Sequence, residues 1–449
     1  MRQILVLGAG QSSPYLIHTL LEMARQHNWF VTIGDIDLDT AQQRLGDHPR
    51  GSAIYFDVHD TALRSSQVEH ADVVVNMLAP AFQDLIASEC IRHGRHMLSV
   101  SYRSQATRNM HADAQRKGVL LLCEMGLDPG IDHMSAMALI ERIRGEGGVI
   151  RGFRSYGSGI PSPDQAQNPF QYLITWNPRN VVMAGEHGAQ YMERGRIKLV
   201  PYNQVFHHTW PVEVEGFGTL EAYPNRDSLS YMKSFGLDDV ETMIRGTLRY
   251  SGWSETWAEI VRLGLPNETL RIPDLHAHTY REVIEMFLPL NLEGESPIER
   301  RVARFLGISP TGRIMQNMQW LGLFSKEKIR CEGDTAAAML VALLQEKLPL
   351  TDGVTDAVIL VHEVDVEYPQ SDRPAEEITS TMIVKGEPGR FTAMAKTVGL
   401  PAALAVELLL TKRLPLTGSQ IPTHPSIYEP VLRGLSQQQI RFSEKSAPL

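Results

Sequence analysis

The stretch that decides the fold reads ILVLGAGQSSPYLIHTLL and occupies residues 4–21. Its first four residues are apolar and predict a buried strand, and the segment from Pro14 onward has the apolar spacing of a helix. Between them lies the pattern G-x-G-x-x-S. Its first glycine permits a tight turn, and its second lets the backbone approach a pyrophosphate at the helix N-terminus. This context favours a dinucleotide site over a plain turn. The residues expected to bind the cofactor here are Gly8, Gly10, Gln11 and Ser12.

Short apolar runs alternate with amphipathic segments through the first 124 residues. Strands spaced in this way, with helices between them, are typical of βαβ units and a parallel sheet. We therefore predict an α/β fold with a Rossmann-type parallel-sheet domain. The predicted strands are residues 4–7, 30–33, 53–56, 73–75, 97–100 and 119–122.

Asp35 ends the second predicted strand. It lies roughly 25 residues after Gly10, near the spacing of roughly 20 at which an acid binds the ribose hydroxyls in NAD enzymes. Asp37 is also close, and no arginine follows before Arg44. Because carboxylates repel a 2′-phosphate, the sequence favours NAD over NADP. The alternative is that Asp35 is an exposed turn residue.

Asp57 and Val58, after the third strand, are expected to border the adenine.

Ligands of open α/β sheets bind outside the carboxyl ends of the strands, so the residues after the later strands are candidates for the nicotinamide half. Residues 76–80, NMLAP, follow the fourth strand, and Ser101 and Tyr102 follow the fifth. The two hydroxyls either line the active site or are structural, and we favour the active site.

The segment EMGLDPGIDH, residues 124–133, follows the sixth strand. Asp128 precedes a proline, which restricts it to an extended conformation. A carboxylate there can bind an ammonium group and exchange a proton with it, so Asp128 is our best candidate for catalysis. The alternative is that it caps the next helix. We favour capping for Asp132 and a packing or capping role for His133.

Composition excludes several classes of protein. The chain has 449 residues, enough for two or three domains, with 43% hydrophobic residues, 21% charged residues and a net charge of −9. A net-acidic chain without a basic patch is not expected to bind nucleic acid. An apolar strand follows within three residues of Met1, and no apolar stretch approaches the roughly 20 residues of a membrane span. We therefore expect a cytoplasmic protein.

The three cysteines form no CxxC pair, so neither a zinc site nor a disulfide framework is expected. Cys123 ends an apolar run and is interpreted as an inert core thiol. No metal site is expected elsewhere.

The second half of the chain changes character several times. Residues 151–210 are dense in Gly, Pro and Asn and are interpreted as loop-rich. Residues 254–263, 280–287, 297–305 and 336–344 are predicted helices, residues 357–366 and 378–384 are predicted antiparallel strands, and residues 392–410 form a further predicted helix. Arg226, Arg245 and Arg249 offer guanidinium forks for carboxylates, although each is equally compatible with a solvated ion pair.

At these residues the chain resembles the saccharopine reductases, the glutamate-forming saccharopine dehydrogenases. The resembling segments run nearly from end to end. They are residues 8–10 (GAG), 57–58 (DV), 101–102 (SY), 126–133 (GLDPGIDH), 176–179 (WNPR), 224–228 (PNRDS), 245–250 (RGTLRY) and 427–430 (IYEP).

The resemblance implies a three-part homodimeric enzyme. Its parts would be a Rossmann domain (residues 1–125 and 391–449), an α+β substrate-binding and dimerisation domain with a mixed sheet (126–235 and 346–390), and a helical insertion (236–345). It would interconvert saccharopine with glutamate and 2-aminoadipate 6-semialdehyde, in lysine metabolism, using NAD or NADP. By similarity, the cofactor would contact Leu78, Ala79, Val100, Ser101 and Leu127, and the substrate would contact Ser101, Tyr102, Asp128, Arg226, Thr247, Leu248 and Arg249.

Three departures from the family pattern matter. Asp35-Ile-Asp37 replaces a Cys-Arg-Thr type of turn found where NADP is used, Leu173 replaces a lysine of the site region, and Gly157 replaces a cysteine. Two other functions therefore stay open. One is a related carboxynorspermidine-type dehydrogenase, whose polyamine substrate would need acids rather than arginines. The other is a dimer that senses nucleotides without catalysis.

Overall fold

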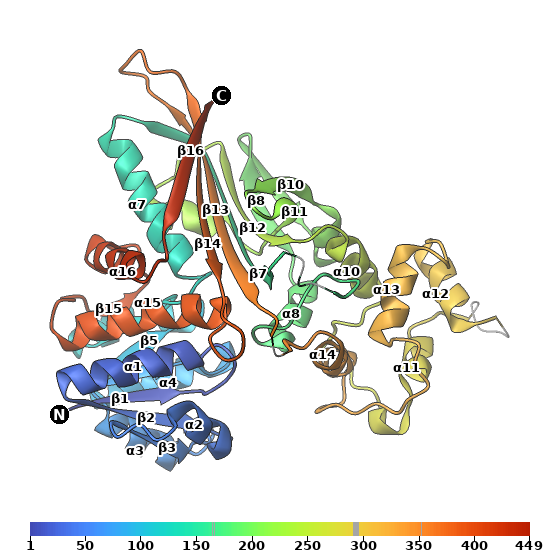
Figure 1. The fold of residues 1–449 in the computed structure, drawn as a ribbon, viewed down its shortest axis with the longest axis horizontal. Helices are drawn as coiled ribbons and strands as arrows, with labels where there is room; N and C mark the ends of the chain where they lie inside the picture. The colour runs from blue at the N-terminus through green and yellow to red at the C-terminus, as the bar shows by residue number, and fades with distance from the viewer. Residues whose placement is uncertain (164, 166, 291–295, 352) are drawn as a thin grey trace. The chain divides into compact units, whose positions relative to one another are not determined.

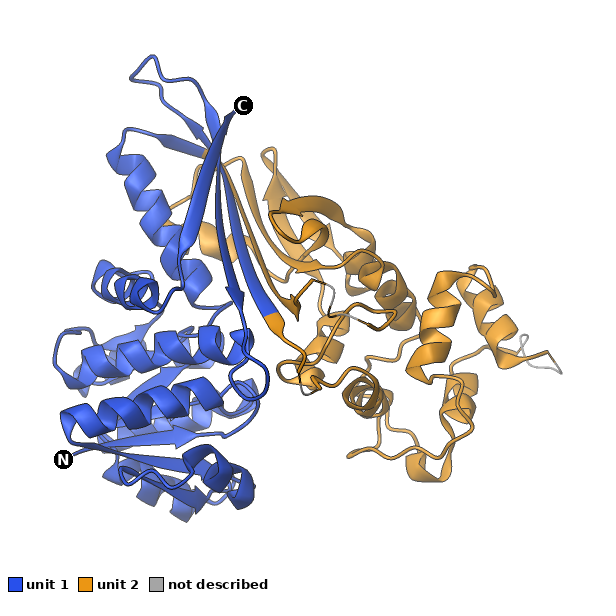
Figure 2. Cartoon of the chain, in the orientation of Figure 1, with its two compact units in different colours: residues 1–150, 357–449 blue, residues 151–356 orange. Residues whose placement is uncertain are grey.

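The computed structural model describes residues 1–163, 165, 167–290, 296–351 and 353–449 (Figure 1). The chain divides into two compact units (Figure 2). Unit 1 combines Met1–Ile150 with Ala357–Leu449, and unit 2 is Arg151–Asp356. This division does not test the three-part division drawn from the resemblance, which stays a prediction.

A seven-stranded parallel sheet organises unit 1 and confirms the Rossmann-type domain. All six strands predicted from the apolar runs are present. A seventh, three residues long, comes from near the C-terminus and pairs with β6, and sequence analysis missed it. In spatial order the strands are β15 (Gly418–Gln420), β6 (Leu120–Leu122), β5 (His96–Ser99), β4 (Val73–Asn76), β1 (Arg2–Leu7), β2 (Trp29–Asp35) and β3 (Gly51–Tyr55).

Helices cover both faces of this sheet. Residues of α3, α4 and α6 share one buried apolar cluster with alternate residues of the strands, such as Leu5 and Leu7. Helix α1 packs against α15 at very close range, because a Cβ on Gly399 would lie 2.6 Å from the backbone nitrogen of Leu16. The helices of unit 1 are α1 (Pro14–His27), α2 (Leu38–Leu45), α3 (Thr61–His70), η1 (Pro80–Phe82), α4 (Gln83–His93), α5 (Gln105–Asn109), α6 (His111–Arg116), α7 (Ile131–Gly145), α15 (Ala393–Leu410) and α16 (Pro425–Gln437).

Helix α15 corrects one expectation from the sequence. Its 18 residues are long and apolar enough to span a membrane, by length and composition alone. However, 72% of this helix is buried inside the protein, against α1 and the strands β4 and β5. Its apolar character is therefore that of a core helix, with Pro401 in its interior.

Unit 1 also contains three antiparallel strands: β13 (Asp356–Glu367), β14 (Glu376–Lys385) and β16 (Phe442–Pro448). Strand β14 pairs with both of the others, and the β13–β14 pairing confirms the antiparallel pair predicted there. The alternating burial of β14 fits a strand with one face on the core.

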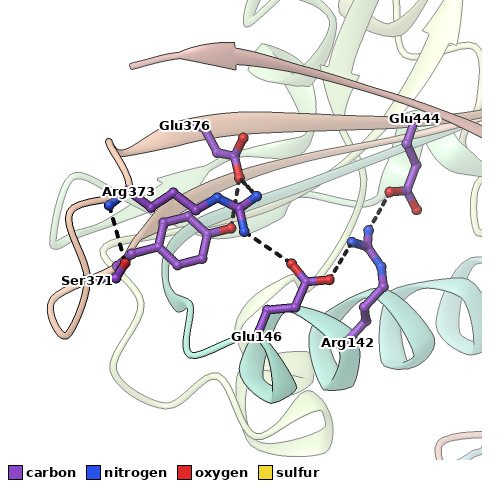
Figure 3. Close-up of polar contacts among 7 residues, drawn as sticks. Arg142, Glu146, Ser371, Arg373, Glu376 and Glu444 are labelled. Atoms are coloured by element: carbon purple, nitrogen blue, oxygen red, sulfur yellow. Dashed lines mark hydrogen bonds and ion pairs between the residues drawn. The ribbon is translucent and has the colours of Figure 1, made fainter.

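An ion network joins the end of α7 to this antiparallel group (Figure 3). Glu146 accepts hydrogen bonds of 3.2 Å from Arg142 and from Arg373. Arg142 also pairs with Glu444 of β16, and Arg373 pairs with Glu376 of β14. Exposed ion pairs of this kind each contribute little to stability, so we regard the network as fixing the orientation of the hairpin rather than as a large energetic term.

Unit 2 is built on a mixed sheet. Strand β12 pairs in parallel with β7 on one edge and antiparallel with β8 and β11 on the other. Strand β10 pairs antiparallel with β11, and β9 pairs antiparallel with β8. The strands are β7 (Val149–Pro161), β8 (Ala189–Glu193), β9 (Arg196–Val200), β10 (Trp210–Val214), β11 (Gly218–Pro224) and β12 (Thr242–Arg249). The interpretation of residues 151–210 as loop-rich was wrong for β7, β8 and β9. The glycines of β7 masked a strand whose second half is fully buried.

Helices make up most of the rest of unit 2. The four helices predicted in this half of the chain are confirmed as α10, α11, α12 and α14, and α13 was missed. The helical elements are α8 (Pro178–Met183), η2 (Ala184–Glu186), η3 (Tyr202–His207), α9 (Leu229–Phe235), α10 (Trp253–Arg262), η4 (Leu275–Ala277), α11 (Tyr280–Met286), α12 (Ile298–Leu306), α13 (Arg313–Leu321) and α14 (Ala336–Lys347).

Candidate active site

The glycine-rich turn between β1 and α1 has the geometry that a dinucleotide requires. Gly8 has φ of +102°, and a Cβ there would lie 3.0 Å from the backbone of Met77, so only glycine fits. A Cβ on Gly10 would meet nothing within 4 Å, which leaves space in front of the turn. The Ser13 side chain does not cap α1, and no acid lies in the first turn of this helix. The helix N-terminus can therefore offer its N–H groups and positive dipole end to a pyrophosphate.

Asp35 lies directly against this turn. One of its carboxylate oxygens accepts a 2.6 Å hydrogen bond from the backbone N–H of Ala9, and the other accepts one from Asp37. The guanidinium Nε of Arg44 donates to the carbonyl oxygen of Ala9 at 3.2 Å, a contact that the sequence did not predict. Burial, together with the nearby positive charge of Arg390, lowers the pKa of Arg44. The Asp35 carboxylate and the Arg44 guanidinium thus both contact the backbone of Ala9 in this turn.

The other predicted cofactor residues of unit 1 all follow strands of the parallel sheet, and so lie at its carboxyl edge. Val58 and Leu127 are buried, Asp57, Leu78 and Val100 are half-buried, and Ala79 is exposed. In the turn itself Gln11 is exposed and Ser12 half-buried. Their contacts with a cofactor stay predictions.

Asp128 and Tyr102 meet at the same edge. The Tyr102 hydroxyl donates a 2.9 Å hydrogen bond to the Asp128 carboxylate. From Val119 to Met137, Asp128 is the one residue that is not buried. The N-cap position of α7 is Gly130 and not Asp128. The turn that presents it needs glycine at position 130, where φ is +150° and a Cβ would lie 2.0 Å from the carbonyl oxygen of Gly126.

Behind Asp128 lies a buried network of charged groups. The His133 ring is fully buried, with Nε2 2.8 Å from a Glu124 oxygen and Nδ1 3.1 Å from an Asp132 oxygen. Burial alone would lower the pKa of His133, but the two carboxylates raise it to about 9. The two carboxylates therefore favour the imidazolium form of the ring. Glu124 also accepts a 2.9 Å hydrogen bond from the backbone of Arg103, next to Tyr102. His133 was expected to pack or cap, and its ionic role was missed because Glu124 is nine residues away in the sequence.

A second missed residue supports the turn after β5. Gln83 is buried at the start of α4, and its amide nitrogen donates to the carbonyl oxygen of Tyr102 at 2.9 Å. Its amide oxygen accepts a 2.6 Å hydrogen bond from Ser99, whose hydroxyl in turn accepts from the N–H of Ser101. Nothing in the sequence around Gln83 indicates this role, because the contact joins α4 to the end of β5.

In unit 2, Arg249 has an unusual environment for a charged group. Only 6% of it is exposed, and its guanidinium lies 4.7 Å from the ring centre of Tyr172 and 5.6 Å from that of Trp253. It donates to the Ser158 hydroxyl and the Leu248 carbonyl oxygen, but among the described residues it pairs with no acid, and its Nε has no acceptor. A buried guanidinium without an acid partner is costly unless an anion compensates it. Arg249 is thus suited to bind a carboxylate.

The other predicted substrate residues of unit 2 differ from Arg249 in their exposure and in their neighbours. Arg226 is exposed, in a turn with φ of +53°. Arg245 is buried, with its guanidinium 4.4 Å from the ring centre of Tyr231. Thr247 is half-buried, two residues before Arg249 on β12. Leu248 is fully buried between them, and strand alternation directs its side chain to the opposite face, so only its backbone can share a site with its neighbours.

Comparison with known proteins assigns the chain to a family. A family model described as "Saccharopine dehydrogenase NADP binding domain" matches residues 4–122, and one described as "Saccharopine dehydrogenase C-terminal domain" matches residues 126–440. The chain belongs to the saccharopine dehydrogenase family. It is an oxidoreductase family with a nicotinamide-binding domain, as the resemblance implied.

The similarity to known proteins covers nearly the whole length of this chain. The chain is 30% identical to "Saccharopine dehydrogenase [NADP(+), L-glutamate-forming]" of Saccharomyces cerevisiae, covering 97% of each chain. It is 29% identical to the mitochondrial alpha-aminoadipic semialdehyde synthase of Bos taurus, of which it covers 48%. The solved apo structure of the S. cerevisiae saccharopine dehydrogenase (L-Glu forming) matches all of this chain with a TM-score of 0.84 at 28% identity. This match confirms the predicted fold class.

Proposed function

We propose that this saccharopine dehydrogenase family member is the glutamate-forming enzyme. It would interconvert saccharopine and water with glutamate and 2-aminoadipate 6-semialdehyde, using a nicotinamide cofactor. The observation that carries the proposal is the Tyr102–Asp128 pair, whose carboxylate is the one partly exposed residue of a long buried segment. The pair lies at the strand ends where a Rossmann-type domain binds its ligand.

The chemistry suits this pair. In the reducing direction the amine of glutamate attacks the aldehyde carbon, water leaves, and the resulting C=N bond is reduced to the secondary amine. The bound cofactor supplies the hydride for this reduction. Asp128 would take a proton from the glutamate ammonium, which frees the nitrogen for attack, and would return a proton to nitrogen on reduction. Tyr102 would hold the Asp128 carboxylate in orientation through its hydroxyl.

The buried guanidinium of Arg249 supports an acidic substrate. Saccharopine carries three carboxylates, and Arg249 can bind one of them with two parallel hydrogen bonds. A polyamine substrate, as in the carboxynorspermidine-type alternative, would instead be repelled by this uncompensated positive charge. Leu173, which replaces the family lysine, is buried and brings no charge to this region.

We propose NAD as the preferred cofactor, unlike the relatives named for NADP(+). The support is the carboxylate of Asp35, held 2.6 Å from the N–H of Ala9, where the ribose of a dinucleotide meets the second strand. Arg44 lies at this turn and Arg390 lies near it, and both can attract a 2′-phosphate, so the preference depends on the balance between Asp35 and these two cations.

A direct assay tests both proposals. Purified protein is mixed with saccharopine and either NAD or NADP, and nicotinamide reduction is followed by absorbance, with liquid chromatography to identify glutamate. We expect turnover with saccharopine and a higher kcat/KM with NAD. Tight NADH binding without turnover of saccharopine would instead favour a sensor. The homodimeric state and cytoplasmic location stay predictions, which sedimentation and cell fractionation would test.

A further inference from the structure

Hydrogen bonds and one ion pair link Tyr102 and Asp128 to the buried His133 ring. Tyr102 bonds Asp128 directly. On one side, the backbone N–H of Arg103, next to Tyr102, donates to Glu124. On the other side, the backbone N–H of Gly130, two residues after Asp128, donates to Asp132 at 2.6 Å. The two acids are joined by His133.

Building on the proposed function, we infer that His133 is a positioning residue, which holds the Asp128 carboxylate against the Tyr102 hydroxyl by joining Glu124 to Asp132. The ring contacts both acids, at 2.8 Å and 3.1 Å, and is itself fully buried. It lies behind the reacting groups and is not expected to touch substrate or cofactor.

Two features show that this segment needs such a clamp. Glu124 has φ of +63°, an unfavourable backbone conformation for a residue other than glycine, so tertiary contacts must hold it there. Without the His133 ring, the Glu124 and Asp132 carboxylates would be buried together, each repelling the other. The structure would relax by separating them, and this would move the ends of the segment that carries Asp128. A misplacement of about 1 Å in an active site is enough to lower a rate by roughly 100-fold.

The experiment compares His133→Gln with His362→Gln. His362 is the matched control: it is also fully buried in unit 1, and its ring contacts the Ser135 hydroxyl at 2.7 Å. We expect His133→Gln to lower kcat for saccharopine by roughly 10- to 100-fold, with NADH affinity, measured by fluorescence titration, unchanged. His362→Gln should lower thermal stability but leave kcat unchanged. Equal kcat in the two variants would overturn the inference.

A second pair of variants covers the case that His133→Gln does not fold. Asp132→Asn retains an acceptor for the Gly130 N–H and a donor for a neutral His133 side chain, so both contacts of residue 132 can persist. Asp132→Ala removes both contacts. We expect Asp132→Asn to keep most of the kcat that Asp132→Ala loses. A similar loss in both would contradict a role in positioning.

A readout independent of turnover separates this inference from the proposed function. The protein is labelled with carbon-13 in its tyrosine rings, and the Tyr102 signal is assigned by its absence in Tyr102→Phe. His133→Gln should shift this signal, whereas His362→Gln should not. If the wild type fails to use saccharopine, the proposed function is wrong, and this shift still decides whether His133 positions Tyr102 and Asp128.

Discussion

Tyr102 donates a hydrogen bond of 2.9 Å to Asp128, although the two residues follow different strands of the parallel sheet. Tyr102 comes after β5 and Asp128 after β6, and the parallel pairing of these strands brings both to one edge. The pairing of the two strands therefore brings into direct contact two residues that are 26 positions apart in the sequence.

Asp128→Asn should abolish most of the activity. The amide cannot accept a proton from the substrate nitrogen, and loss of a general acid–base group lowers rates by about 10²- to 10⁴-fold. Steady-state kinetics with saccharopine would measure the fall in kcat, and fluorescence titration should show unchanged NADH binding. Asp113→Asn is the control, because this acid is exposed on α6 and pairs with Arg116. Full activity in Asp128→Asn would exclude Asp128 from proton transfer.

Arg249→Lys should weaken substrate binding. Lysine keeps the charge but cannot form two parallel hydrogen bonds with a carboxylate. We expect a loss of roughly 1.5–3 kcal/mol, the range for a hydrogen bond to a charged group, seen as a raised KM for saccharopine at constant NADH affinity. Arg271→Lys, at an exposed arginine paired with Asp334, should leave KM unchanged. An unchanged KM in Arg249→Lys would place the carboxylate site elsewhere.

Asp35→Asn should shift the cofactor preference toward NADP. The amide oxygen can still accept the N–H of Ala9, but the charge that repels a 2′-phosphate is gone. Titration of the NADPH Kd should show tighter binding by about tenfold, as expected for removal of roughly 1.4 kcal/mol of repulsion. Adding Arg44→Gln should reverse this gain. If the wild type already prefers NADPH, Asp35 does not select the cofactor.

The stability of unit 1 should fall as pH rises from about 6.5 to about 9. The pKa of His133 is raised from 6.5 to about 9, so its protonation stabilises the fold fully below 6.5, and this contribution is lost as pH rises through the folded value. The expected size is roughly 3 kcal/mol, at 1.36 kcal/mol for each pKa unit. Urea unfolding across this pH range would measure it, and His133→Gln should flatten the slope. The same slope in both proteins would mean that His133 is neutral in the fold.

Short-range patterns predicted most of the nucleotide-binding sheet, because each strand is an apolar run next to a glycine, acid or proline turn. They also made Asp128 a candidate for catalysis, whereas the substrate role of Arg249 came from the resemblance, and both roles stay predictions. They did not predict β7, since its glycines resemble a loop, or β15, which is only three residues long. Arg44, Gln83 and the Glu124–His133 contact were missed for a different reason. Their partners are defined by the fold and not by spacing along the chain.

The close contact of α15 with α1 and the pairing of β15 with β6 have a consequence for biosynthesis. The first 122 residues emerge from the ribosome long before residues 393–420, which complete their sheet and cover their apolar surface. During translation of the intervening segments, the nascent nucleotide-binding half lacks a helix and an edge strand. Part of its apolar surface therefore stays exposed to solvent during this time, and chaperones can bind there. We therefore expect the yield of active protein in a heterologous host to depend on chaperone supply.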